Sequence, residues 1–517
     1  MKNIKPKLEL IKSKTVYKKN PTNLFSQLCG NKTSTLLLES ADINSKNNLK
    51  SLLIIDSCLR IIANKNIVNI QAFSENGSLL LQLLDKILPK IIVNNKKIEN
   101  RVLIIPINKN LQDEDTRLKS LSIFDILRFM FQLVKLPKNE NKAMLLGGLF
   151  SYDLIYNFES LPNIQQENIC PDYCFYLSEI LLTIDHKNKI SELQGSLYVP
   201  CQKEFYRLKK RIQEIKKQIL ISDKIQNNLK NKFFTKLSYS CNKSDIQYLN
   251  IIKNVKNYIN AGEIFQIVPS RKFFIICKNP LSSYHTLKKI NPSPYMFFMQ
   301  DKEFILFGAS PESSLKFNAI NRQVEIYPIA GTRTRGYKNG ILNLDLDSRI
   351  ELEMRTSQKE MAEHLMLVDL ARNDLAKICV PGSRYVAKLT KVDRYAYVMH
   401  LVSQVIGTLK PDLDILHAYQ ACMNMGTLTG APKIRAMELI AKIENEKRGS
   451  YGGAIGYLTA NGDLDTCIII RSAYIKNNIA TIQAGAGIIL DSQPKEEVNE
   501  SFNKARAVLY AIEKNNI

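Results

Sequence analysis

The sequence lacks any apolar run long enough to cross a membrane. A membrane-spanning helix needs about 18 or more consecutive apolar residues, and none of the 517 residues begins such a run. The basic start, MKNIKPKLELIKSK, is also without the apolar core and the small-residue cleavage site of a secretory signal. We therefore expect a cytoplasmic protein that has no membrane partner.

Paired cysteines and clustered histidines are absent as well. Of the ten cysteines, only Cys170 and Cys174 are close in sequence, and no second pair matches their C-x3-C spacing. A zinc site or a disulfide framework would need more ligands at regular spacing. Five histidines also do not favour a three-histidine zinc centre. We expect reduced and mostly buried thiols.

The net charge of +23 is the composition's one strong bias. Such an excess occurs in proteins that bind nucleic acid. Here, however, the lysines are spread along the chain among many Asn and Ile residues, and no zinc finger, basic zipper or RNP-like motif is present. Lys, Asn and Ile share AT-rich codons, so mutational drift accounts for the charge. We expect no nucleic-acid partner and keep a nucleic-acid-binding descendant of an enzyme as the alternative.

What remains is an ordinary globular composition, with 45% hydrophobic residues, arranged in three blocks. Residues 1–200 mix short strand-like runs with polar turns, 201–245 hold a basic helix and a polar linker, and 246–517 contain most of the glycines. The apolar positions of the basic helix recur at spacings of three and four. They are Phe205, Leu208, Ile212, Ile215 and Ile219.

The third block contains a β-meander flanked by helices. GAIGYLTA, DTCIIIRSAYI and IATIQAGAGII read as strands separated by Asn461-Gly462 and Asn477-Asn478, which are typical of hairpin turns. Apolar stripes predict helices over about 357–376 and 495–512. This mixture indicates an α+β fold in which large antiparallel sheets pack as a sandwich with helices outside.

The stretch PIAGTRTRG, residues 328–336, reads as a ligand-binding loop that follows the strand-like QVEIYP. Its two glycines allow backbone amides to approach an anion closely. The third residue of the loop, Ala330, has no reactive group. A loop of this kind therefore suits ligand binding without covalent attachment at that position.

Two helices carry carboxylates one turn apart. Glu360 and Glu363 lie on the first predicted helix, and Glu497 and Glu500 lie on the second. Mg²⁺ commonly takes one or two protein carboxylates together with waters and an anionic substrate group. The alternative is solvated helix charge, because Glu500 precedes Lys504 by four residues, as in many surface ion pairs.

Other segments suit a substrate with carboxylate groups. Gly485 and Gly487 straddle Ala486 at a strand end, where backbone N–H groups are accessible. Tyr451 and Arg471, read as strand residues, supply a phenol and a guanidinium. NMGTLTGAPK adds a loop that opens a helix, with Thr427, Thr429, Gly430 and Lys433. By itself, His400 on a strand-like run is more often structural.

Taken together and in order, these motifs resemble the chorismate-utilising enzyme family, and within it the component I subunits of anthranilate synthases. The matching segments include LLLESADI, GEIFQIVPSR, NPSPYMFF, GASPES, PIAGTRTRG, KEMAEHLMLVDLARNDL, YVMHLVSQV, MGTLTGAPKIRAMELI, YGGAIGY, CIIIRSAYI, QAGAGI and NKARAVL. The resemblance spans nearly the whole chain. It implies the family's chorismate-binding fold, with residues 1–200 as a regulatory domain interlocked with the catalytic domain of residues 246–517.

Two positions select the reaction within this family. Relatives that make aminodeoxychorismate carry a nucleophilic lysine at the place of Ala330, and isochorismate and salicylate synthases carry a water-activating lysine at the place of Gln266. Neither Ala nor Gln performs those tasks. The resemblance therefore implies a lyase that aminates chorismate directly and then eliminates pyruvate to give anthranilate, in the first step of tryptophan biosynthesis. Aminodeoxychorismate synthase is the alternative that Ala330 disfavours.

The resemblance also assigns roles to individual residues. It implies that Mg²⁺ is held by Glu363 and Glu500, and that Glu360 is the general acid for the departing C4 hydroxyl group. His400 and Thr427 match positions assigned to the catalytic site. Chorismate is implied to contact Gly331, Thr332, Tyr451, Arg471, Gly485, Ala486 and Gly487.

A partner and an effector are implied in the same way. No cysteine lies on a glycine-flanked elbow and no His-x-Glu pair occurs, so we expect ammonia to come from a separate glutamine amidotransferase subunit, component II, in a heterotetramer with two of each subunit. LLLES and NPSPYMFF resemble the family's segments that bind L-tryptophan as a feedback inhibitor. The implied effector residues are Glu39, Ser40, Pro294, Tyr295 and Met296.

Overall fold

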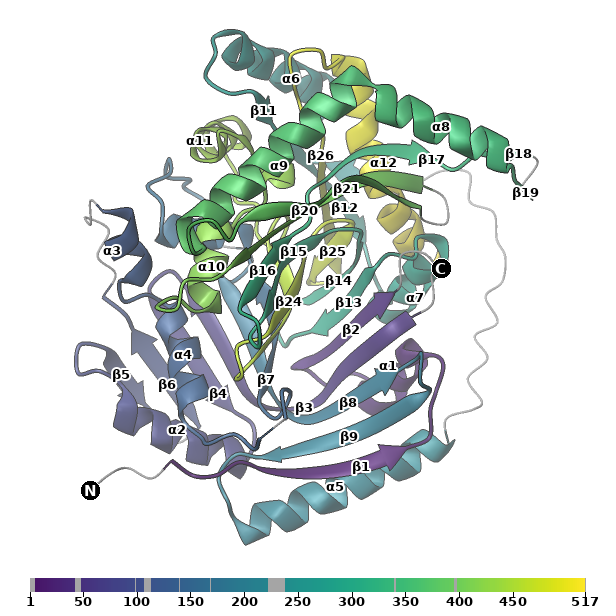
Figure 1. Cartoon of the computed structure of the whole chain (residues 1–517). Coiled ribbons are helices and arrows are strands. Elements are labelled where there is room, and N and C mark those ends of the chain that lie inside the picture. The colour runs from purple at the N-terminus through teal and green to yellow at the C-terminus, as the bar shows by residue number, and fades with distance from the viewer. Residues whose placement is uncertain are drawn as a thin grey trace.

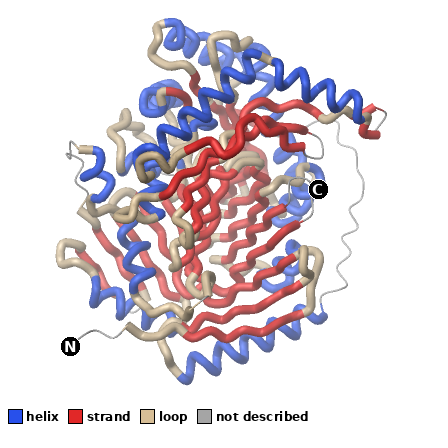
Figure 2. Tube along the Cα trace, in the orientation of Figure 1, coloured by secondary structure: helices blue, strands red, loops and turns tan. Residues whose placement is uncertain are grey.

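The computed structural model describes residues 5–41, 48–97, 99–106, 113–138, 140–167, 169–221, 238–338, 341–394 and 398–516. Strands occupy the centre of the molecule and helices surround them (Figures 1 and 2). At the middle of the sheet, β3 (Asn48–Asn64) and β8 (Tyr173–Asp185) form a long antiparallel pair, with Lys50 opposite Asp185 and Ala63 opposite Tyr173. Two series of strands extend from this pair.

The first series, the β3 limb, continues through strands from both halves of the chain, all antiparallel. In order it contains β2 (Thr35–Ala41), β13 (Tyr295–Gln300), β14 (Ile305–Ser310), β25 (Ser472–Lys476), β26 (Ile479–Gly485), β12 (Ser270–Ile276) and β10 (Ser240–Cys241).

The second series, the β8 limb, is built in the same antiparallel way. In order it contains β7 (Leu145–Phe150), β23 (Ala454–Thr459), β24 (Leu464–Ile468), β15 (Ser313–Asn318), β16 (Gln323–Ile326) and β21 (Val398–Thr408), and β21 also pairs with β17 (Ile329–Thr334) and β20 (Tyr385–Arg394).

Shorter strands complete the sheet and its margins. β9 (Ile190–Leu197) joins β8 to β1 (Glu9–Thr15), and β4 (Ile67–Ala72) joins β3 to β6 (Asn100–Ile104) and β5 (Val93–Lys96). Two small separate sheets are β11 (Gln266–Ile267) with β22 (Gly430–Ala431), and β18 (Tyr337–Lys338) with β19 (Ile341–Leu342).

The two limbs face each other across a buried apolar core. This core combines Leu36, Phe297 and Leu306 of the β3 limb with Leu149 and Ile455 of the β8 limb. Each limb buries its other face under helices. The predicted α+β sandwich with helices outside is therefore confirmed.

The helices divide between the two outer faces. α1 (Pro21–Cys29), α5 (Gln202–Ile221), α7 (Pro280–Ile290) and α12 (Pro494–Glu513) contribute to the core outside the β3 limb. α2 (Glu75–Ile87), α4 (Phe124–Gln132), α9 (Gln358–Ile378) and α10 (Ile415–Cys422) contribute to the core outside the β8 limb. The remaining helices are α3 (Glu114–Lys119), η1 (Tyr152–Asn157), α6 (Asp245–Asn260), α8 (Leu344–Thr356), η2 (Gly426–Leu428) and α11 (Lys433–Glu444).

The predicted meander is present, but one of its strands is divided. DTCIIIRSAYI forms β24 in the β8 limb and β25 in the β3 limb, and the chain crosses between the limbs at Arg471, whose φ is 50°. Neither Arg471 nor Tyr451 is in a strand, contrary to our expectation. This crossing places Arg471 at the junction of the two limbs.

The other predicted elements had mixed outcomes. The helices predicted over about 357–376 and 495–512 are α9 and α12, and the apolar stripe of 201–221 is the buried face of α5, apart from half-buried Phe205. Eight of the ten cysteines are buried and all are free. PIAGTRTRG is not a loop, because Ile329–Thr334 form β17. Most of the predicted linker, residues 222–237, lies outside the described residues.

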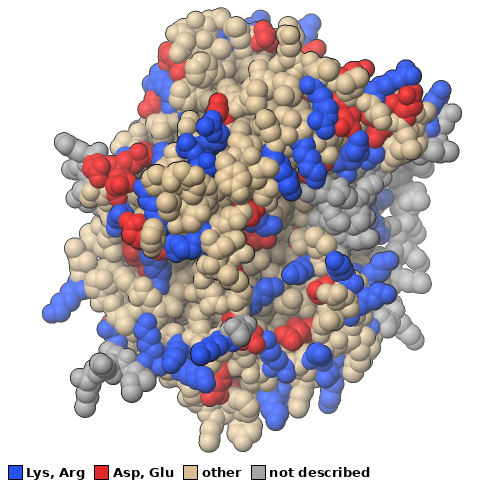
Figure 3. Space-filling model, in the orientation of Figure 1, with Lys and Arg blue, Asp and Glu red and all other residues tan. Residues whose placement is uncertain are grey.

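The three predicted blocks share one sheet. β2 pairs with β13 and β7 pairs with β23, so the strands of residues 1–200 join those of residues 246–517 at one place in each limb, and β10 of the middle block pairs with β12. Within the described part of the chain, no helix is both long and apolar enough to cross a bilayer. On the face shown in Figure 3, basic and acidic side chains are interspersed.

Candidate active site

A bulge in β17 brings the chain against the start of α9. The pairing of β17 with β21 shifts between Ala330 and Thr332, and Gly331 between them has a φ of 72°. A side chain at Gly331 would begin 3.2 Å from Oε2 of Glu360, so glycine is needed both for the conformation and for the space. The side chain of Thr332 lies outside the described residues.

Local sequence explains why Glu360 is held at this point. Ser357 caps α9 and its hydroxyl accepts a hydrogen bond from the Glu360 backbone N–H. A carboxylate in the first turn of a helix is favoured by the helix dipole. The Glu360 carboxylate forms an ion pair with Arg333 of β17. Glu363 follows one turn later on the same helix.

His400 lies on β21 opposite the bulge. It is 8% exposed and donates a hydrogen bond to the backbone carbonyl of Gly331. Burial, aided by the nearby charge of Arg471, lowers the pKa of His400 to about 4. The imidazole is therefore neutral at physiological pH.

Arg471 and Tyr451 meet where the chain crosses between the limbs. Burial lowers the pKa of the Arg471 guanidinium, and the nearby Tyr451 and Glu500 act in the opposite direction. Burial raises the pKa of the Tyr451 hydroxyl to about 12, although that hydroxyl receives a hydrogen bond from the backbone N–H of Gly485. Contacts and charges thus link Gly331, His400, Arg471, Tyr451 and Gly485 in one cluster.

The glycines of QAGAGII are required by close packing. A side chain at Gly485 would begin 2.2 Å from the Pro269 carbonyl oxygen, and one at Gly487 would begin 2.7 Å from Nε2 of Gln266. Gln266 is 5% exposed, and its Oε1 atom has no hydrogen-bond partner within the described part of the chain. Gln266 Oε1 is therefore an exception among buried acceptors, most of which have a hydrogen-bond partner.

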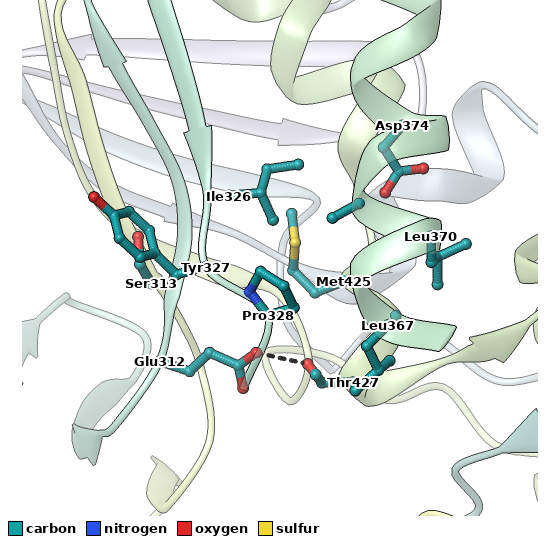
Figure 4. Close-up of a pocket in the computed structure, with 12 residues that line it drawn as sticks. Glu312, Ser313, Ile326, Tyr327, Pro328, Leu367, Leu370, Asp374, Met425 and Thr427 are labelled. Atoms are coloured by element: carbon teal, nitrogen blue, oxygen red, sulfur yellow. Dashed lines mark hydrogen bonds between the residues drawn. The ribbon is translucent and has the colours of Figure 1, made fainter. Parts of the chain in front are cut away.

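Sequence reasoning missed Glu312, which follows β14 in GASPES. The Thr427 hydroxyl donates a 3.1 Å hydrogen bond to Glu312 Oε1, and both residues line a cavity together with Pro328, Leu367 and Met425 (Figure 4). Burial raises the pKa of Glu312 to about 8, against the effect of the Thr427 hydrogen bond and the Lys504 charge. Glu312 is therefore mostly protonated at neutral pH. The motif was visible, but its sequence gives no sign of burial.

Lys504 bears on the alternative that Glu500 is part of a surface ion pair. Its ammonium does pair with Glu500, at 2.6 Å, but it also donates a 3.0 Å hydrogen bond to the carbonyl of Gly485. Lys504 thus lies in the cluster and not on an isolated surface turn. The i, i+4 spacing alone could not distinguish these two placements.

The carboxylates suit a hard cation. Among the described residues, no three His, Cys, Asp or Glu side chains are grouped as a metal site, but Mg²⁺ needs only one or two carboxylates when substrate and water complete its shell. Glu500 and Glu360 are each balanced by a side-chain cation, Lys504 and Arg333. Glu363 and Glu500 supply the carboxylate oxygens that a hard cation prefers.

A second cluster lies where β2 meets β13. The register places Ser40 opposite Tyr295 and Glu39 opposite Met296, with Pro294 immediately before, so all five predicted effector residues come together. Neighbouring side chains of a strand point to opposite faces. Met296 packs in the outer core, while Tyr295 packs against the core between the limbs. Glu39 and Ser40 therefore face different sides.

The two faces have different partners. On the outer face, the Glu39 carboxylate pairs with Lys288 and accepts a 2.6 Å hydrogen bond from the Tyr284 hydroxyl. On the inner face, the Tyr295 hydroxyl donates to Asp465 of β24 over 3.3 Å. Burial raises the pKa of Asp465. Asp465 is thus the carboxylate on the Tyr295 side, and the sequence alone did not suggest it.

Comparison with known proteins gives consistent matches over the whole chain. The model of the chorismate binding enzyme family matches residues 89–510. The anthranilate synthase component 1 of Escherichia coli (strain K12) is 58% identical over 513 residues, which cover 99% of this chain and 98% of that protein. The same-named protein of Buchnera aphidicola subsp. Acyrthosiphon pisum (strain APS) is 58% identical over 512 residues, with the same coverage.

Solved structures agree with the fold. The crystal structure of anthranilate synthase component I from Streptococcus pneumoniae TIGR4 has a TM-score of 0.67 at 29% identity, covering 89% of this chain and 92% of that chain. MenF, the menaquinone-specific isochorismate synthase from Escherichia coli, has a TM-score of 0.65 at 17% identity, covering 98% of this chain and 95% of that chain. At that identity the second likeness concerns the fold alone.

Proposed function

The chain belongs to the chorismate-binding enzyme family, in its anthranilate synthase component I branch, and from this premise we propose that it converts chorismate and ammonia to anthranilate and pyruvate in tryptophan biosynthesis. The observation that carries the proposal is the single cluster formed by Gly331, His400, Arg471, Tyr451 and Gly485. These residues come from five segments and offer a guanidinium, a phenol and backbone groups to a dicarboxylate.

We assign substrate binding to this cluster. The guanidinium of Arg471 and the hydroxyl of Tyr451 would bind the enolpyruvyl carboxylate, because charge-assisted hydrogen bonds are strong in a buried site. Backbone groups at Gly331 and Thr332 on one side and at Gly485, Ala486 and Gly487 on the other would enclose the ring. A side chain at Gly485 would meet the Pro269 carbonyl and one at Gly487 would meet Gln266, so both positions present bare backbone.

Glu363 and Glu500 would hold Mg²⁺, which when bound supplies a positive charge for the ring carboxylate of chorismate. The donor set supports this, because both groups are carboxylates. Lys504, which pairs with Glu500 at 2.6 Å, would have to release that carboxylate. Lys504 would then retain its hydrogen bond to the Gly485 carbonyl.

The departing C4 hydroxyl needs a proton as ammonia adds at C2, and two carboxyl groups are candidates. Glu360 is the donor that the family resemblance implies, but its ion pair with Arg333 favours the charged form. Glu312 has a pKa of about 8 and so keeps its proton at neutral pH. The proton donor is one of these two groups, and their substitution distinguishes them.

After amination, the C2 proton must leave while the enolpyruvyl C–O bond breaks and pyruvate departs. His400 is the candidate acceptor of that proton because it is neutral and lies beside Gly331, although burial, which lowers its pKa to about 4, makes it a weak base. Nearby, the unpartnered Oε1 of Gln266 could accept a hydrogen bond from ammonia, whereas Ala330 offers no nucleophile. Ala330 thus disfavours a covalent intermediate, and Gln266 disfavours activation of water.

We further propose that a separate glutaminase subunit supplies the ammonia, in a heterotetramer with two of each subunit. The name of the relatives, component 1, supports a second component. L-Tryptophan would act as feedback inhibitor at the β2–β13 cluster. Ser40, Tyr295 and Asp465 would face the amino acid there, and Glu39 and Met296 would contribute through their backbone, because their side chains lie on the outer side.

The direct test supplies the purified chain with chorismate, Mg²⁺ and ammonium and records anthranilate by its fluorescence. We expect anthranilate and equimolar pyruvate with ammonium but none with glutamine. Aminodeoxychorismate without pyruvate would favour the alternative synthase. Absence of both products, or turnover with glutamine alone, would contradict the proposal.

A further inference from the structure

Arg448 is a buried cation outside the predicted substrate contacts. It lies just beyond α11, which ends at Asn445 in the left-handed conformation, and it is only 4% exposed. Burial alone would lower the pKa of Arg448, but the Glu444 carboxylate raises it above its ordinary value. A permanent charge in this position must be compensated completely by the surrounding groups.

The guanidinium of Arg448 donates four hydrogen bonds. Two go to the Glu444 carboxylate, at 2.9 and 2.6 Å, and two go to the backbone carbonyls of Leu428 and Val268, both at 2.7 Å. Leu428 lies between Thr427 and Thr429, so one of these bonds fixes the segment that carries Thr427. Val268 follows β11, where Gln266 lies.

Two aromatic rings pack against the same guanidinium. Its central carbon lies 4.7 Å from the ring centre of Tyr152 and 5.6 Å from that of Tyr451. Such cation–π contacts orient a ring as well as stabilise it. Arg448 therefore also orients Tyr451, whose hydroxyl accepts a hydrogen bond from the Gly485 backbone N–H.

Glu444 extends the network to the third substrate segment. It accepts hydrogen bonds from the Ser270 backbone N–H at 2.7 Å and from the Ser270 hydroxyl at 2.8 Å. Ser270 is the residue directly opposite Gly485 in the pairing of β12 with β26, and its hydroxyl also accepts a 2.7 Å hydrogen bond from Gln483. The ion pair thus reaches the Thr427 segment, the Tyr451 ring and the Gly485 strand.

We propose that Arg448 is the positioning residue that keeps these three segments in one geometry for chorismate. The proposal rests on the proposed function, and Arg448 itself need not touch the substrate. Lysine cannot replace Arg448. Its single ammonium group has three donors, too few for two hydrogen bonds to a carboxylate and two more to separate carbonyls. Misplacement of reacting groups by about 1 Å can reduce turnover about a hundredfold.

The test is Arg448→Lys, with Arg60→Lys as the matched control. Arg60 is also 4% exposed, and it donates two 2.8 Å hydrogen bonds to Asp301, but it contacts no predicted chorismate residue. Both substitutions remove a buried bidentate ion pair, so both should lower the melting temperature. We expect Arg448→Lys to reduce kcat/KM with chorismate by about 10- to 100-fold, with a weaker Kd for chorismate by calorimetry, and Arg60→Lys to change both less than about threefold.

Similar kinetics for the two folded variants would overturn the proposal and leave Arg448 with a purely structural role. If Arg448→Lys does not fold, Glu444→Gln carries the test, since it keeps the guanidinium but weakens the link to Ser270. A wild-type KM and Kd in Glu444→Gln would likewise overturn the proposal. Chorismate binding separates this result from the proposed function: a wild type that binds chorismate but makes no anthranilate contradicts only the reaction.

Discussion

The active-site cluster and the β2–β13 cluster both join residues that are far apart in the sequence, but they are built differently. The active-site cluster combines Gly331 of β17 and Gly485 of β26 with Arg471, which lies where the chain crosses between the limbs. In the second, a single strand register aligns Ser40 with Tyr295 and Glu39 with Met296. Because side chains alternate along a strand, that register also sends the two pairs to opposite faces.

This difference determines what a motif can reveal. Motif order can indicate that two segments are neighbours, and it did so at both places. At the active site, neighbouring segments suffice, because the contacts include backbone groups and side chains of many elements. At the β2–β13 cluster, neighbouring residues of one motif do not share a ligand-facing side, so LLLES cannot supply both a carboxylate and a hydroxyl to the same ligand.

The largest effect should come from the predicted metal ligands. Glu500→Gln or Glu363→Gln removes one of two anionic ligands, and a metal that contributes several kcal/mol to catalysis should then be lost, reducing turnover about a thousandfold. The assay is anthranilate formation at limiting Mg²⁺, together with Mn²⁺ binding measured by electron paramagnetic resonance.

Glu496→Gln is the control for that prediction, because Glu496 is exposed on the same helix one turn earlier. It should bind Mn²⁺ and turn over as the wild type does. Unchanged Mn²⁺ binding in Glu500→Gln and Glu363→Gln would show that these carboxylates are ordinary helix charges and that the active-site cluster is smaller than proposed.

The next effect distinguishes the two candidate proton donors. The variant of the true donor, Glu312→Gln or Glu360→Gln, should lower kcat by about 10²–10⁴-fold with little change in the Kd for chorismate. The other variant should be affected much less in kcat. We expect Glu312→Gln to be the more severe, because Glu312 retains its proton at neutral pH. A weaker Kd at constant kcat in both variants would assign both residues to binding.

Much of the fold could be predicted because its signals are local. The apolar stripes of α9, α12 and α5 and the Asn-containing turns of the meander each depend on a few neighbouring residues. The crossing at Arg471 could not be predicted in the same way. DTCIIIRSAYI reads as one continuous strand, and its division depends on which distant strands pair with each half.

The same reasoning explains the site residues that were missed. Glu312, Lys504 and Arg448 are charged residues whose roles depend on burial, and a sequence shows charge but not burial. A spacing of four residues between Glu500 and Lys504 is equally compatible with a solvated ion pair and with the observed contact to Gly485. Ala330 and Gln266 were informative for the opposite reason, because there the chemical identity itself excludes a reaction.

A smaller effect concerns pH and depends on Glu312. Its pKa is raised from 4.5 to about 8, so the protonated form dominates below that pH and is lost as the pH rises through it. At a constant concentration of free ammonia, kcat should therefore fall about tenfold for each unit above pH 8 if Glu312 donates the proton. Because this pKa is raised on folding, the free energy of unfolding should fall as the pH rises from about 4.5 to about 8 and should no longer depend on Glu312 above that range.

The measurement is a pH profile of kcat at saturating chorismate, with ammonium adjusted at each pH to keep free ammonia fixed. Glu312→Gln should abolish the falling limb, whereas Glu360→Gln should retain it. A falling limb that persists unchanged in Glu312→Gln would exclude Glu312 as the titrating donor.

The smallest effect on uninhibited turnover belongs to the β2–β13 cluster, where substitutions should change kcat less than about twofold because the site is distinct from the substrate contacts. Ser40→Phe would fill the inner side, and Asp465→Asn would remove the carboxylate that faces it. Both should abolish inhibition by tryptophan, which we expect to lower chorismate affinity about 5- to 150-fold in the wild type. Equal inhibition of these variants and the wild type, or no inhibition of the wild type, would contradict the effector site.

The outer face provides the decisive comparison. If Glu39 acts only through its ion pair with Lys288, then Glu39→Gln and Lys288→Gln break the same contact and should change tryptophan inhibition in the same direction. If instead the Glu39 carboxylate binds the ammonium group of tryptophan directly, Lys288→Gln frees that carboxylate and should strengthen inhibition, while Glu39→Gln weakens it. Titration of tryptophan against both variants, at a fixed chorismate concentration near KM, separates these outcomes. We expect the two variants to agree, because strand alternation turns the side chain of Glu39 away from Ser40, Tyr295 and Asp465.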